Sequence, residues 1–311
     1  MSIHSSATVK MRSPLSSRST GPVWGFVGVT AFSFTMPFTR AAVGGLSPLF
    51  LGSGRAVVAA VLAGVVLTAT RPAPPSGAQW GRLAVVAAGI VVGFPVLTSY
   101  ALTVTPASHG AVVVALLPAA TAVAAVVRTG ERPGRVFWIC SLAGAAAAVM
   151  FALIHGGGLG GVHRAGLLLF GAVLAAAVGY AEGGLLAREI GSWQTVSWAL
   201  ILSLPLMLMF AGVAVVRQPP SGTAADWACF AYLSAVSMYL GFFAWYRGLA
   251  IGPMAGVSQV QLVQPVMSIC WAALILGEHV GALTLAGGLG VIACAAGAIR
   301  SRLRLNGAAA R

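Results

Sequence analysis

Residues 79–131 read QWGRLAVVAAGIVVGFPVLTSYALTVTPASHGAVVVALLPAATAVAAVVRTGE, and the same pattern returns without a gap 147 positions later, at residues 226–278. The matching positions are Trp80 and Trp227, Pro106 and Pro253, Pro118 and Pro265, and Gly130-Glu131 and Gly277-Glu278. Two copies of one unit in a hydrophobic chain are typical of transporters built from related halves. The repeat therefore predicts a solute pathway between two homologous bundles.

The composition indicates that lipid covers most of the surface. Of the 311 residues, 59% are hydrophobic and only 7% are charged, whereas a soluble protein carries about 25% charged residues. The net charge of +13 does not indicate nucleic-acid binding, because the basic residues lie between apolar stretches, where they set membrane topology. The four cysteines lie inside apolar stretches without metal-ligand spacing, so we expect no metal site, no structural disulfide and no cofactor.

Proline, glycine and arginine divide the chain into ten apolar stretches of about 20 residues, the length that crosses a bilayer. The predicted spans are residues 22–41, 46–69, 81–101, 106–128, 134–154, 165–187, 193–216, 226–250, 253–275 and 282–300. The predicted fold is an all-α polytopic membrane protein with ten transmembrane helices in two inverted five-helix repeats. Its predicted parts are an N-terminal tail (1–21), a first repeat (22–154), a glycine-rich linker (155–164), a second repeat (165–300) and a C-terminal tail (301–311).

Charges between the spans predict the orientation. With the N-terminus inside, fourteen Lys and Arg residues fall on the inner side and three on the outer side, so both termini are expected in the cytoplasm. An odd number of helices per repeat then inserts the second copy upside down. Glu131 lies beside arginines, whereas its equivalent Glu278 does not, as expected for loops on opposite sides.

Short motifs in both copies resemble a known family. These are Tyr100-Ala-Leu-Thr-Val-Thr-Pro-Ala107, Leu116-Leu-Pro118 and Gly130-Glu-Arg132 in the first copy, and Trp245-Tyr246, Gly252-Pro253, Gln264-Pro-Val266 and Gly277-Glu278 in the second. They resemble the EamA repeat of the drug/metabolite transporter superfamily, as does Leu46-Ser47-Pro48 followed by Arg55. The resemblance implies two inverted five-helix bundles and export or exchange of small metabolites by alternating access, without implying a particular substrate.

Two charged residues inside predicted spans are candidates for substrate binding or coupling, because charges in a membrane are costly. Glu182 either carries protons or pairs with an arginine at the inner interface. Arg55, in the second span, either pairs with Glu182 or anchors a carboxylate of the substrate. The two side chains are expected within ~9 Å of each other along the membrane normal of a ~30 Å core, close enough to meet.

The ninth span carries a polar face. Ser258, Gln261 and Gln264 recur at three-residue spacing, and the two glutamines are expected near the midplane, where transporter sites lie. They either line the substrate cavity or form hydrogen bonds between helices. Tyr239, in the middle of the eighth span, requires a hydrogen-bond partner.

Prolines recur at matching positions in the middle of two spans. Pro118 and Pro265 each remove a backbone hydrogen bond, so both are expected to kink their helices. The kinks are candidate hinges, although fixed packing geometry explains them equally well.

The function hypothesis is a secondary transporter in the bacterial plasma membrane that exports or exchanges a small polar or amphipathic solute, with amino acids as one class. No HExxH, GxSxG or Walker A pattern occurs, which argues against an enzyme and against ATP as the energy source. The alternative is a passive channel or a membrane scaffold. The partners to consider are a small-molecule substrate, protons, the lipid bilayer and a second copy of the chain.

Overall fold

The structure is a computed structural model, and it describes residues 20–129, 134–155, 164–251, 257 and 260–309. All regular elements in these ranges are helices. The first half contains α2 (Thr20–Ser33), α3 (Thr35–Ala42), α4 (Pro48–Thr70), α5 (Gly77–Val86), η1 (Ala87–Gly93), α6 (Phe94–Ala101), α7 (Ala107–Val114), α8 (Leu117–Thr129) and α9 (Arg135–His155). The second half contains α10 (Arg164–Glu189), α11 (Ser192–Arg217), α12 (Ala224–Tyr232), η2 (Leu233–Leu240), α13 (Gly241–Ile251), η3 (Gln261–Val263), α15 (Gln264–Leu276) and α16 (Ala282–Ala309).

These elements confirm the all-helical membrane fold. Six continuous or joined helices are long and apolar enough to cross a bilayer: Pro48–Thr70, Gly77–Ala101, Ala107–Arg128, Arg164–Glu189, Ser192–Arg217 and Ala224–Ile251. Shorter apolar helices lie at Arg135–Gly144, Gln261–Leu276 and Ala282–Cys294, and α2 with α3 makes up the first segment. Together they account for the two sets of five predicted helices. Most of the predicted linker, residues 156–163, lies outside the described ranges.

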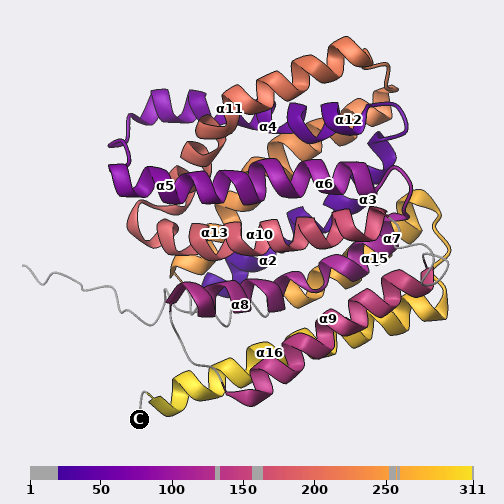
Figure 1. Ribbon diagram of the computed structural model, residues 1–311. Helices are drawn as coiled ribbons and strands as arrows, with labels where there is room; N and C mark the ends of the chain where they lie inside the picture. Colours follow the sequence, from indigo (N-terminus) through magenta and orange to yellow (C-terminus); the bar gives the residue numbers. More distant parts are fainter. Residues whose placement is uncertain (1–19, 130–133, 156–163, 252–256, 258–259, 310–311) are drawn as a thin grey trace, which may run out of the picture.

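Equivalent spans of the two halves run in opposite directions. In Figure 1, α5 and α6 run from left to right, whereas their equivalents α12 and α13 start at the right and end at the left. Both spans begin with the same capping arrangement. The N–H of Ser76 donates to Oε1 of Gln79 at 2.9 Å, and the N–H of Thr223 donates to Oδ2 of Asp226 at 2.8 Å. A local signal at the same offset of 147 thus starts both helices, in opposite orientations.

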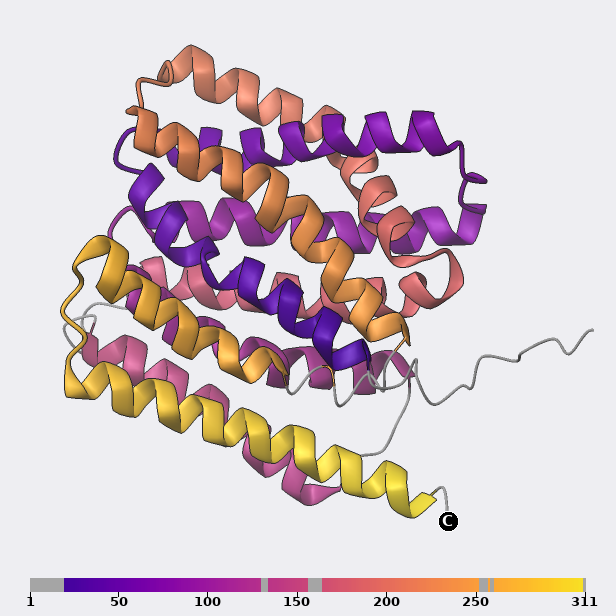
Figure 2. The same ribbon diagram turned by 180° about the vertical axis from the view of Figure 1, so that it is seen from behind.

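The two halves interlock as a pseudo-symmetric pair. Helix α4 packs along its equivalent α11, and α9 packs along its equivalent α16. Helix α2 packs on α13, and the symmetry-related helix α10 packs on η1 and α6. Figures 1 and 2 show α9 and α16 as an outer pair at one side of the bundle.

Helix irregularities also recur at the repeat offset. The π-helical segments η1 and η2 occupy equivalent positions in the third and eighth spans. Ahead of Pro118, α7 ends and α8 begins after a two-residue turn, and ahead of Pro265 the 3-10 segment η3 precedes α15. The regular α-helix is therefore interrupted before both prolines, and a role of these breaks as hinges stays a prediction.

Glycines allow the closest helix contacts. A Cβ atom on Gly89 of η1 would lie 2.3 Å from the carbonyl oxygen of Ala175, and one on Gly179 would lie 2.7 Å from Cγ2 of Ile90. A Cβ atom on Gly248 would lie 2.8 Å from the backbone nitrogen of Gly25. These contacts hold α10 on η1 and α2 on α13, as small residues commonly do between membrane helices.

We predict that Gly89→Ala lowers thermal stability, because backbone opposes the new methyl group and the cost of such overpacking is about 1–3 kcal/mol. The matched control is Gly81→Ala in the same span, where a Cβ atom would meet nothing within 4 Å. The control should unfold at the wild-type temperature or slightly above it. Thermal unfolding in detergent measures both, and equal temperatures for the two variants would contradict the prediction.

Candidate functional site

A small polar cavity lies at the centre of the bundle, where both halves meet. Its walls come from α2, α3, α4 and η1 with α6 of the first half, and from α10, η2, α13 and α15 of the second. Its volume is about 20 Å³, which is room for one water molecule. The polar residues that line it are Thr35, Arg55, Tyr180, Ser237 and Gln264.

Arg55 is the buried charge of this cavity. It lies seven residues into α4 after Pro48, roughly 10 Å along the helix. It is 2% exposed, and its Nε and Nη2 atoms have no hydrogen-bond partner among the described residues. An unpaired buried guanidinium is costly, so it requires an explanation other than stability.

Two glutamines each have a buried side-chain atom without a hydrogen-bond partner. Gln264 begins α15 directly before Pro265 and lines the cavity, and its Oε1 atom has no partner among the described residues. Gln261 is buried one turn earlier, and its Nε2 atom is likewise without a partner there. Arg55 and Gln264, each with an unmet hydrogen-bonding atom, thus line the same cavity. Neither glutamine uses those atoms to join helices.

The other polar residues near the ninth span have structural partners. Ser268 donates to the carbonyl oxygen of Ser33 at 2.7 Å, and Thr35 shares a 2.7 Å hydrogen bond with Ser237 across the two halves. The hydroxyl of Tyr239 lies 3.0 Å from Oγ of Ser197, so this tyrosine joins η2 to α11 and does not line the cavity. Ser258 lies outside the described residues.

Glu182 forms an ion cluster away from the cavity. Its carboxylate on α10 accepts from Nε of Arg82 on α5, and from Nε of Arg128 on α8 at 2.7 Å. Arg82 also binds Glu189 at 2.6 Å. The considered Arg55–Glu182 pair is absent, because both carboxylate oxygens of Glu182 already bind these other arginines. Pairing of Glu182 with an arginine is one of the two interpretations from the sequence, and the structure identifies the partners as Arg82 and Arg128.

A second set of polar contacts between helices lies at the start of the fourth span, opposite the end that carries Arg128. Glu278, just after α15, accepts hydrogen bonds from the backbone N–H groups of Ala107 and Ser108 at 2.7 and 2.9 Å. It therefore caps the start of α7, where the helix dipole favours a negative charge. Arg40 on α3 donates to the carbonyl oxygens of Leu102 and Thr103 at 2.7 and 2.9 Å.

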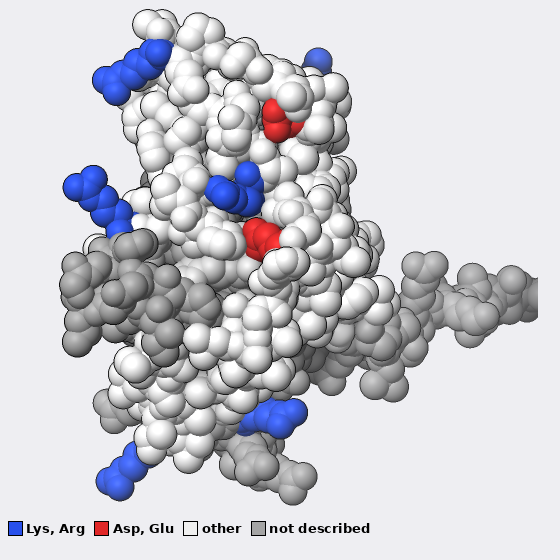
Figure 3. Space-filling view, turned by 90° about the vertical axis from the view of Figure 1, so that its right-hand side faces the viewer, with Lys and Arg blue, Asp and Glu red and all other residues white. Residues whose placement is uncertain are grey.

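Arg40 and Glu278 border a surface cavity of about 430 Å³ at this end. Figure 3 views this end and shows few charges on a mainly uncharged surface. The ion cluster of Glu182 lies ~32 Å away along the fourth span, since 21 helical residues separate Ala107 from Arg128. The central cavity therefore lies between two sets of polar contacts: the Glu182 ion cluster at one end of the bundle and the hydrogen bonds of Glu278 and Arg40 at the other.

Comparisons with known proteins agree with this architecture. Residues 19–153 and 163–300 each match the EamA-like transporter family. A relative from Bacillus subtilis (strain 168), described as the uncharacterized transporter YdeK, is 45% identical over 283 residues, covering 90% of this chain and 97% of the relative. A solved crystal structure of a protein is 17% identical and superposes with a TM-score of 0.63 over 93% of this chain and 99% of its own, which supports the fold.

We predict that Arg55→Met separates function from stability. Removing an unpaired buried charge should leave the unfolding temperature unchanged or raised. Transport should fall at least ~10-fold, the equivalent of losing one charged hydrogen bond to the substrate. Arg55→Lys keeps the charge without the planar pair of donors and should be intermediate. Normal transport together with a large loss of stability in Arg55→Met would make Arg55 a structural residue.

Proposed function

Because the chain belongs to the EamA-like transporter family, we propose that it is a secondary transporter that binds a small polar or amphipathic metabolite in the central cavity. One observation carries this proposal. Arg55, whose Nε and Nη2 atoms are unpaired, and Gln264, whose Oε1 atom is unpaired, both line the same buried space between the two halves. Transporter substrate sites lie at such repeat interfaces near the midplane.

The chemistry of the cavity favours a zwitterion such as an amino acid. The planar guanidinium of Arg55 matches a carboxylate through two parallel hydrogen bonds. The free carbonyl oxygen of Gln264 accepts a hydrogen bond from an ammonium or hydroxyl group. The rings of Phe32, Phe242 and Tyr180 pack beside this polar pair and offer an apolar wall for a side chain.

Alternating access requires the cavity to open toward one side at a time. At about 20 Å³ it holds no metabolite in the present closed state. We infer that breaking the Glu182–Arg82–Arg128 cluster opens one end, and that breaking the bonds of Glu278 to α7 opens the other. The break before Pro118 lies midway along the span that joins these two sets of contacts, and the break before Pro265 directly precedes Gln264 of the cavity, which makes both breaks the proposed hinges.

The proposed setting is the bacterial plasma membrane with both termini in the cytoplasm. The Glu182 end then faces inward, consistent with its excess of arginine. Glu182 is the proposed proton carrier, since opening the cluster would free its carboxylate. Export or exchange of the metabolite would follow the proton or substrate gradient.

A passive channel is the alternative function. The closed central cavity favours a carrier, because a channel needs a continuous path in at least one stable state. We predict saturable counterflow: proteoliposomes preloaded with amino acids should accumulate the labelled solute transiently, and flux should saturate with concentration. Flux that rises linearly without counterflow would support a channel instead.

A thermal-shift screen of amino acids and related metabolites identifies the solute that binds. The variant Gln264→Leu should lose the ligand-induced rise in unfolding temperature, while its unfolding temperature without ligand stays that of the wild type.

We predict that Glu182→Gln removes the pH dependence of transport, because the neutral amide neither titrates nor binds two arginines as an ion. The matched control is Glu189→Gln on the same helix, whose carboxylate binds Arg82 but is half-exposed at the helix end. The control should keep the wild-type pH profile. Transport by both variants is measured in proteoliposomes across a series of imposed pH gradients. An unchanged profile in Glu182→Gln at normal expression would remove this residue from the coupling mechanism.

A further inference from the structure

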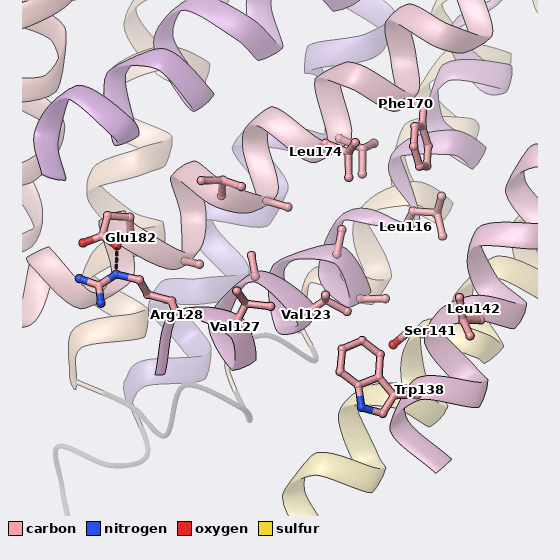
Figure 4. Close-up of a pocket in the computed structure, with 17 residues that line it drawn as sticks. Leu116, Val123, Val127, Arg128, Trp138, Ser141, Leu142, Phe170, Leu174 and Glu182 are labelled. Atoms are coloured by element: carbon pink, nitrogen blue, oxygen red, sulfur yellow. Dashed lines mark hydrogen bonds and ion pairs between the residues drawn. The ribbon is translucent and has the colours of Figure 1, made fainter. Parts of the chain in front are cut away.

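An apolar groove separate from the central cavity runs between α8, α9 and α10. Its volume is about 890 Å³, the size of a site for a large ligand. Figure 4 shows Val123 and Val127 of α8, Trp138 and Leu142 of α9, and Phe170 and Leu174 of α10 around this space, with the Arg128–Glu182 pair at one end. The proposed transport cycle involves only the Arg128–Glu182 pair at its end and assigns no role to the apolar length of the groove.

The groove is open toward the lipid. Its rim consists of large apolar side chains that are exposed on membrane-spanning helices: Val127, Trp138, Leu142, Leu174 and Val178. Residues exposed at this depth contact acyl chains, since no water is present in the hydrocarbon core. The occupant must therefore be apolar along most of its length.

The length of the groove matches one leaflet. Along α10 it extends from Phe170 to Glu182, which is roughly 18 Å at 1.5 Å per residue. One leaflet of the hydrocarbon core is ~15 Å thick. Because the groove follows the helices, an acyl chain lying in it would extend from the interface toward the midplane.

The charged end of the groove fits a phosphate. The side chain of Arg128 is 51% exposed, and its interaction with Glu182 uses Nε. Arg135 is exposed at the first turn of α9, the helix that forms the opposite wall. Glu182 neutralises one of these two charges, and Glu189 offsets Arg82, so the groove end keeps a positive charge. Basic pockets between membrane helices bind anionic headgroups.

We propose that this groove binds one anionic phospholipid, with an acyl chain against Trp138 and Leu142 and its phosphate at Arg128 and Arg135. The lipid belongs to the leaflet on the Arg128 side. It covers the gap between the outer pair α9–α16 and the rest of the bundle. Its phosphate competes with Glu182 for Arg128, so the lipid contacts the ion cluster directly.

The experiment is fluorescence quenching of the full-length protein in vesicles. Phosphatidylglycerol or phosphatidylcholine with brominated acyl chains is added in turn, and the contribution of Trp138 is the difference between the wild type and Trp138→Phe. We expect quenching of Trp138 to favour the brominated anionic lipid about fivefold for each arginine that contacts it. High salt should reduce this preference, because the headgroup contact is at the membrane surface.

Two variants and one control separate a site from ordinary surrounding lipid. Arg128→Gln should reduce the preference for the anionic lipid, and Ala124→Phe, which fills the groove, should reduce quenching by both lipids. The control Arg164→Gln, at the other end of α10, should keep the wild-type preference for the anionic lipid and the wild-type extent of quenching. Equal quenching by the two lipids would show unselective contact and overturn the proposal. Absence of quenching at Trp138 would also overturn it, because protein would then cover the groove.

Discussion

The absence of water in the hydrocarbon core constrains every part of this structure. Backbone N–H and C=O groups must be satisfied within the protein, so irregular backbone occurs only where other helices cover it. The break before Pro118 follows this rule, since Ala115, Leu116 and Leu117 are all buried. The same rule applies to side chains, and it explains why Thr35, Tyr239 and Ser268 each hold a hydrogen-bond partner.

Arg55, Gln261 and Gln264 depart from that rule together. All three are buried, and each keeps at least one polar atom without a partner among the described residues. Unpaired buried polar atoms also occur in Thr30, Thr39, Thr121, Ser141 and Trp245, so what distinguishes Arg55 and Gln264 is that both line the central cavity. By contrast, the carboxylate of Glu182 accepts hydrogen bonds from Arg82 and Arg128 and so holds helices together. The two buried charges thus differ in environment: Arg55 keeps unpaired atoms beside the cavity, whereas Glu182 joins α5, α8 and α10.

The repeat made much of the fold predictable. Hydropathy and the 147-residue offset predicted the helices, and the proline positions predicted the breaks. Arg55 and Gln264 could be chosen because a polar group in an apolar span is costly wherever it points. Their common cavity could not be predicted, since it depends on how the helices of the two halves are arranged around it. Arg82 and Arg128 could not be identified as the partners of Glu182, because they are distant from it in sequence and only the packing of α5, α8 and α10 brings them together. The π-helical segments left no recognisable pattern, because a widened turn keeps an apolar composition.

The paired segments η1 and η2 record the history of the chain. A π-helical turn holds one residue more than an α-helical turn, and both copies carry it at equivalent positions of a gap-free alignment. The extra residue was therefore present in the ancestral unit before that unit was duplicated. Deleting one residue from η1 would restore an ordinary α-helical turn, because the widened turn accommodates the extra residue locally and keeps Phe94 and Pro95 in register with the cavity wall.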